Sequence, residues 1–157
     1  MSGTETSRRL FLLAGTAAAG RLLGKVTGEE VLYVGGTVTS LPEATPGAVD
    51  IKNEEKLVFS SDKGGFDIAY ARIKTIEYGQ KAGRRVGVAI VINVWALFSK
   101  KRKHFLTLGY DDAAGKPQGV VLEIGKGRAK TFIAILEARS GKKVEYESEE
   151  AKKHVHG

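Results

Sequence analysis

The sequence predicts a mainly β domain, a small antiparallel barrel of about seven strands followed by one C-terminal helix. Short runs of β-branched and aromatic residues alternate with turn residues over the middle of the chain. The hydrophobic period becomes that of a helix only after these runs. Twenty glycines against three prolines are typical of a chain with many turns, and 157 residues suffice for one such domain.

Strand patterns follow one another along most of the chain. They are predicted at residues 30–39, 48–51, 56–61, 66–70, 72–78, 104–110 and 118–124. The glycines of the first strand (EVLYVGGTVT) indicate a bend or bulge. The segments LPEATPG at 41–47, DKGG at 62–65 and DDAAGKP at 111–117 are predicted to be loops or turns, so the strands are short and antiparallel.

One helix is predicted, at residues 128–141. Phe132, Ile133 and Leu136 fall on one face at helical spacing, and Gly141 stands where the residue after a helix commonly adopts a left-handed conformation. A single amphipathic helix of this kind can cover one open end of a small barrel.

The two ends of the chain are predicted to lie outside this domain. Residues 1–19 have the order of an export signal, with two arginines, an apolar run and small residues at 17–19. Residues 7–12 (SRRLFL) resemble the twin-arginine pattern S-R-R-x-F-L, which implies a periplasmic or extracytoplasmic destination in a bacterium. The alternative is an amphipathic helix at the membrane surface.

The predicted division of the chain follows from these patterns. It is a signal peptide at 1–19, a linker at 20–28, the domain at 29–143 and a charged, flexible tail at 144–157.

The positive charge of the chain is concentrated in one region. The net charge is +7, and no acidic residue occurs between Glu77 and Asp111. Seven basic residues lie in that interval, namely Lys81, Arg84, Arg85, Lys100, Lys101, Arg102 and Lys103. The other basic residues are balanced by the 18 acidic ones. Such a patch favours an anionic partner, with a solvated rim as the alternative.

An apolar segment, residues 86–98, lies between these basic residues. It is too short for a membrane-spanning helix, contains Asn93 and is basic at both ends. Three alternatives remain open for it: a core strand, a protein interface, or a membrane contact. For the last, Trp95 suits the headgroup layer, and the adjacent basic residues suit an anionic surface.

No catalytic site is predicted. His104 begins a strand pattern with no nucleophile at a recognisable spacing, and His154 and His156 fall in the charged tail. Without cysteine or a third ligand the histidines do not predict a metal site, and no cofactor is expected. Nucleic acid is not an expected partner, because no stacking platform or recognition helix accompanies the basic run.

The segment FDIAYARIKTIEY, residues 66–78, resembles a strand-to-strand segment of the pleckstrin-homology-like (PH-like) superfamily, in particular its GRAM-like and bacterial members. With the helix, the likeness covers roughly residues 29–143. The chain also resembles a group of uncharacterised exported bacterial proteins through residues 77–85 (EYGQKAGRR) and 97–106 (LFSKKRKHFL). The PH-like resemblance implies a non-catalytic module that binds anionic headgroups, peptides or proteins.

One departure limits this resemblance. Lipid-binding PH-like domains often carry basic residues in the loop between their first two strands, whereas SLPEATPGAVD, residues 40–50, has none. The expected function is therefore a membrane-associated binding module at the bacterial envelope, with a homo-oligomeric or protein-interaction module as the alternative. The expected binding residues are Arg84, Arg85, Trp95, Lys100, Lys101, Arg102 and Lys103.

Overall fold

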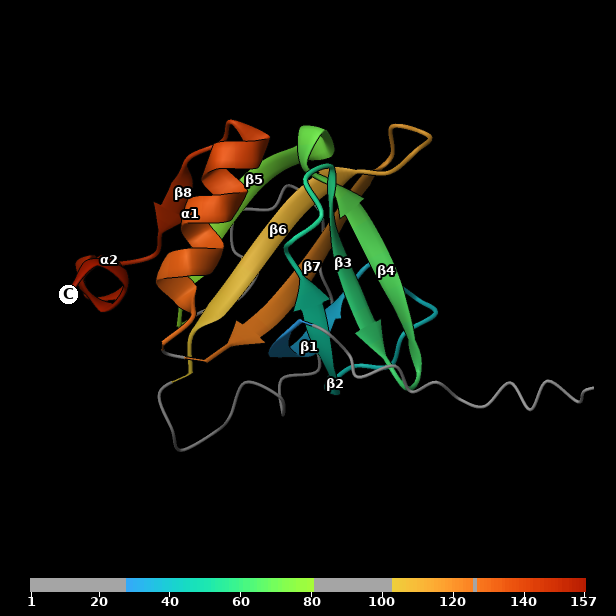
Figure 1. The fold of residues 1–157 in the computed structure, drawn as a ribbon, viewed down its shortest axis with the longest axis horizontal. Coiled ribbons are helices and arrows are strands. Elements are labelled where there is room, and N and C mark those ends of the chain that lie inside the picture. Colours follow the sequence, from blue (N-terminus) through green and yellow to red (C-terminus); the bar gives the residue numbers. More distant parts are fainter. Residues whose placement is uncertain (1–27, 81–102, 126) are drawn as a thin grey trace, which may run out of the picture.

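The structure is a computed structural model that describes residues 28–80, 103–125 and 127–157 (Figure 1). The strands are β1 (Glu29–Gly36), β2 (Thr45–Asp50), β3 (Lys56–Ser61), β4 (Gly64–Ala69), β5 (Ile73–Gly79), β6 (Phe105–Asp111), β7 (Pro117–Ile124) and β8 (Val144–Tyr146). The helices are a 3-10 turn η1 (Tyr70–Arg72), α1 (Ala129–Ser140) and α2 (Glu149–His156). The signal and linker predicted at 1–28 lie, except for Gly28, outside the described residues.

The eight described strands form one sheet in the order β4-β3-β2-β1-β7-β6-β5-β8. Neighbours are antiparallel except β5 and β8, which pair in parallel. The prediction of a mainly β fold with a helix near the C-terminus is confirmed. The prediction of a closed barrel of about seven strands is not, because β4 and β8 each have a single neighbour and an eighth strand is added after α1.

The bend predicted from the glycines of the first strand is present. The register between β1 and β7 shifts between Tyr33 and Gly35, as at a β-bulge. Gly36 then adopts a positive φ of 155°. Beyond it, the amide and hydroxyl of Thr37 donate to the carbonyl of Gly119 at 2.8 and 3.3 Å. These contacts join the two halves of the sheet.

The second strand begins earlier than the sequence predicted, at Thr45 instead of Ala48. Pro46 lacks an amide hydrogen and is therefore disfavoured inside a sheet. Pairing with β3 starts only at Ala48, so Pro46 pairs with Leu32 of β1 at a position where β2 has one neighbour. A proline whose sequence context is typical of a loop is therefore tolerated in this strand.

The helix predicted at 128–141 is confirmed as α1. Ala129, Phe132, Ile133 and Leu136 are at most 2% exposed and belong to the main core cluster, which they share with the inner face of the sheet. Gly141 ends the helix with a left-handed φ of 71°, and its amide donates to the carbonyl of Glu137.

Arg139 fastens this helix to the loop after β2. Its guanidinium donates to the carbonyls of Ile51 and Asn53 and to the hydroxyl of Tyr70, the last at 3.2 Å. It also lies over the ring of Tyr70, 5.3 Å from the centroid. One side chain thus ties α1 to two elements far away in the sequence.

The tail predicted to be flexible, residues 144–157, forms β8 and α2 instead. Ser148 caps α2 by accepting a hydrogen bond from the amide of Ala151 at 3.1 Å. Ala151 and Val155, one helical turn apart, are 1% and 5% exposed. Figure 1 places α1 and α2 at one side of the molecule and the β3–β4 hairpin at the other.

Candidate functional site

The candidate site is the connection between β5 and β6. Of the predicted binding residues, the structure describes only Lys103. The others lie outside the described residues, as does the apolar segment 86–98: Arg84, Arg85, Trp95, Lys100, Lys101 and Arg102. What the structure does give is the position of both ends of this connection.

The two ends meet at adjacent strand positions. Tyr78 pairs with Leu106 and Gly79 with Phe105 in the antiparallel β5–β6 ladder. Gly79 is buried, and a Cβ at this position would collide with the side chain of Glu147. The chain leaves the β5–β6 ladder after Gly79 and re-enters it at Phe105, so the two ends of the connection lie next to each other at one end of the sheet.

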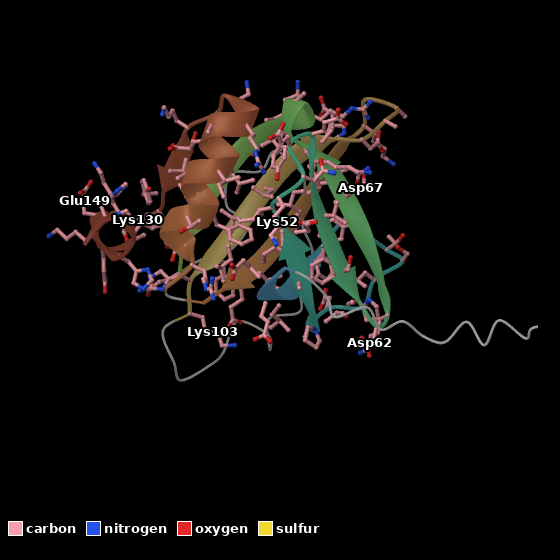
Figure 2. All side chains as sticks on the ribbon, viewed as in Figure 1. Lys52, Asp62, Asp67, Lys103, Lys130 and Glu149 are labelled. Atoms are coloured by element: carbon pink, nitrogen blue, oxygen red, sulfur yellow. The ribbon has the colours of Figure 1, made fainter. Side chains whose placement is uncertain are left out.

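Lys103, which lies just before β6, forms an ion pair with Glu123 of β7. Its ammonium nitrogen lies 2.8 Å from Oε2 of Glu123, and the two side chains are 27% and 24% exposed. A partly buried pair of this kind keeps most of the positive charge of Lys103 engaged with its own sheet. Figure 2 shows Lys103 at the lower edge of the molecule in this view.

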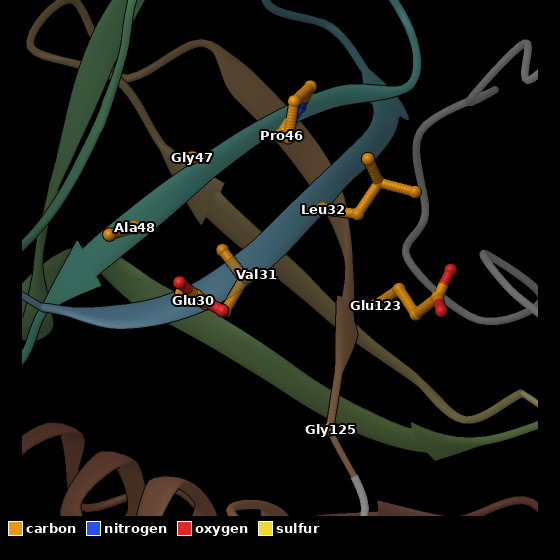
Figure 3. A pocket seen from close by; sticks show the side chains of 8 residues that line it. All are labelled: Glu30, Val31, Leu32, Pro46, Gly47, Ala48, Glu123 and Gly125. Atoms are coloured by element: carbon orange, nitrogen blue, oxygen red, sulfur yellow. The ribbon is translucent and has the colours of Figure 1, made fainter.

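A hollow of about 740 Å³ lies close by, on β1, β2 and β7 (Figure 3). Its lining consists of Glu30, Val31, Leu32, Pro46, Gly47, Ala48, Glu123 and Gly125. The charged groups in this lining are the carboxylates of Glu30 and Glu123, and Glu123 already accepts from Lys103. An anionic ligand would be repelled here, so the hollow does not extend the basic site.

The sheet face opposite the core cluster is closed at its centre. Thr107 pairs with Glu77 on one side and with Val121 on the other, so the three side chains share a face. They are 1%, 5% and 0% exposed, and Phe105 on the same face is 2% exposed. A partner cannot reach these residues in this conformation.

A group of aromatic and imidazole rings, which the sequence analysis did not predict, lies beside the ends of the connection. The imidazoles of His104 and His154 stack with centroids 3.8 Å apart and planes 12° apart. The Tyr78 hydroxyl is hydrogen-bonded to Nδ1 of His154 at 3.0 Å. His156 is bonded in the same way, through Nε2, to the hydroxyl of Tyr146 at 3.0 Å.

Burial raises the pKa of Tyr78 to about 12, with a smaller contribution from Tyr146. The hydroxyl of Tyr78 is therefore neutral at physiological pH and can either donate to His154 or accept from it. This exchange of roles allows the hydrogen bond to persist whether or not the imidazole carries a proton.

A local signal for α2 was present in the sequence. The segment has the pattern of a capped helix. Ser148 stands at the N-cap position, Glu149 and Glu150 lie in the first turn and basic residues lie in the last turn, so the side-chain charges interact favourably with the helix dipole. The scarcity of apolar residues in the same segment is, by contrast, typical of a flexible tail. The stack of His154 on His104 is a tertiary contact that has no local signature.

Within residues 28–80, 103–125 and 127–157, no three histidine, aspartate or glutamate side chains are grouped as metal ligands would be. In the same ranges, no helix has the length and apolar character needed to span a bilayer.

Comparison with known proteins finds no family that matches the chain and no curated protein similar to it.

Proposed function

We propose that this chain is a non-catalytic, PH-like binding module of the bacterial cell envelope that attaches to an anionic membrane surface through its β5–β6 connection. The observation that carries the proposal is the pairing of Gly79 with Phe105. It brings the two ends of the connection that contains the basic residues and Trp95 together at one end of the sheet. The binding residues are Arg84, Arg85, Trp95, Lys100, Lys101, Arg102 and Lys103.

The PH-like part of the proposal is supported by the order of elements. Seven antiparallel strands come first, and α1 follows them with its apolar face on the same core. The first loop again holds no basic side chain, so headgroup contacts at that loop are not proposed. The basic edge of this chain is at the β5–β6 end instead.

Two further features support an anionic partner at that end. The interval between Glu77 and Asp111 holds seven basic residues and no acidic one, and among the described residues Lys103, the last of them, is paired with Glu123. Helix α2 packs against the same end through His154 and presents Lys152 and Lys153 to solvent. Each basic residue near an anionic bilayer contributes about 1 kcal/mol.

Co-sedimentation of the full chain with vesicles tests the proposal. Vesicles of phosphatidylglycerol and phosphatidylcholine are compared with pure phosphatidylcholine at about 50 mM and about 500 mM salt. We expect binding to the anionic vesicles at low salt, and its loss at high salt. No binding at low salt, or equal binding to both kinds of vesicle, would exclude the membrane function.

The mass of the protein in solution distinguishes the homo-oligomeric alternative. If the apolar segment is an interface between copies, the mass rises with protein concentration and falls to that of a monomer in Trp95→Glu. The membrane proposal expects a monomer over the same range, with vesicle binding weakened by the substitution. A retained circular dichroism spectrum shows that the variant is folded.

A further inference from the structure

We propose that α2 is a pH-sensitive clasp: the stacked imidazoles of His104 and His154 hold it against the sheet at neutral pH and release it when both carry a proton. The inference does not depend on the proposed function. It rests on the 3.8 Å stack, which joins the residue before β6 to the C-terminal helix.

The clasp consists of few contacts. α2 inserts Ala151 and Val155 into the core cluster. It also contacts the sheet through His154 and through His156, which is hydrogen-bonded to the Tyr146 hydroxyl of β8. The ring of His154 stacks on His104 and lies 6.2 Å from the centroid of Tyr78. Two small apolar side chains give limited hydrophobic stabilisation, so the ring contacts decide whether α2 stays docked.

Protonation weakens the stack but leaves the hydrogen bond between Tyr78 and His154 in place. Neutral imidazoles stack favourably, and one charged ring beside a neutral one is tolerated. Two charged rings at this separation repel each other, whereas in the undocked helix they are far apart. The undocked state therefore binds more protons, and linkage requires docking to weaken as the pH falls through the range in which imidazoles titrate.

The elements packed next to the stack carry further charged and titratable groups. They are Tyr78 of β5, Lys103 before β6, Glu123 of β7, Tyr146 of β8, Glu147 before α2, Glu137 and Lys130 of α1, and Glu150, Lys152 and Lys153 of α2 itself. Lys103 is paired with Glu123, and Glu137 accepts from the amide of Val144. A nearby carboxylate stabilises a first proton on the stack but does not remove the repulsion that follows the second.

Amide hydrogen exchange of the full chain, corrected for the intrinsic pH dependence, measures the docking of α2. Between pH of about 7.5 and about 5, we expect protection of the α2 amides to fall about ten-fold or more relative to the α1 amides. His104→Phe and His154→Phe each keep a stacking ring and remove one titrating group, so they should remove this response. His156→Phe is the matched control and should retain it.

The ring resonances of the unsubstituted protein provide a second test. Nuclear magnetic resonance should show His104 and His154 titrating together in a transition broader than a one-proton curve. Equal α2 protection at both pH values, the same loss in both phenylalanine variants, or separate one-proton curves for His104 and His154 would overturn the proposal.

Discussion

Replacing Lys100, Lys101, Arg102 and Lys103 together by glutamine is expected to weaken binding to anionic vesicles about 100-fold. Each basic residue near such a surface contributes about 1 kcal/mol, and about 1.4 kcal/mol corresponds to a factor of ten. The loss of Lys103 is expected to contribute little to this change in affinity, because its ammonium group is already paired with Glu123 at 2.8 Å. Three effective charges therefore give roughly two orders of magnitude.

A matched variant separates local charge from net charge. Lys52, Lys63, Lys116 and Lys142 are exposed lysines attached elsewhere in the fold, and their replacement by glutamine removes the same formal charge. Vesicle titrations at low salt should give a loss of less than about five-fold for this variant. Equal losses in the two variants would mean that binding follows the net charge of the protein and not the β5–β6 connection.

Gly36→Ala is expected to lower the free energy of unfolding by about 4 kcal/mol, through backbone strain and overpacking. Gly36 has a φ of 155°, which alanine rarely adopts. A Cβ here would collide with the carbonyl oxygen of Gly119 and lie 2.9 Å from Cα of Val120. Both are backbone atoms of β7, so they cannot rotate away as a side chain could.

Urea unfolding, followed by circular dichroism, measures this loss. Gly127→Ala is the matched control: its added Cβ would meet nothing within 4 Å, so the change should stay within about 0.5 kcal/mol. A cost below about 1 kcal/mol for Gly36→Ala would contradict the close approach of β1 and β7. That approach joins the half of the sheet containing β2–β4 to the half that carries the candidate site.

Local patterns predicted most of the elements correctly. The alternation of Phe66 and Ile68 marks β4, although Tyr70, the next residue of the pattern, lies in η1. The spacing of Phe132 and Leu136 marks a helix that Gly141 ends. These features depend on residues close together in the sequence, where period and turn chemistry are informative.

Features that depend on pairing between distant segments were not predicted. The open edges of the sheet follow from which strands pair, and the position of Pro46 in β2 is tolerated only because β3 begins to pair at Ala48. The helix α2 is stabilised by His154 stacking on His104, a contact between segments far apart in the chain.

The sequence predicts binding residues in the basic region, of which the structure describes Lys103. The pairing of Lys103 with Glu123 could not be read from the sequence, because the segment before β6 meets β7 only in the folded sheet. The pairing of Gly79 with Phe105, which brings the two ends of the β5–β6 connection together, also could not be read from the sequence.

The fluorescence of Trp95 tests the central claim most directly. It is the single tryptophan of the chain, so the emission reports on this residue alone. On anionic vesicles at low salt, the membrane proposal predicts a shift of the emission to shorter wavelength and quenching by lipids brominated on their acyl chains. Sedimentation with the vesicles without a shift or quenching would contradict it, because the protein would then be bound through some other surface.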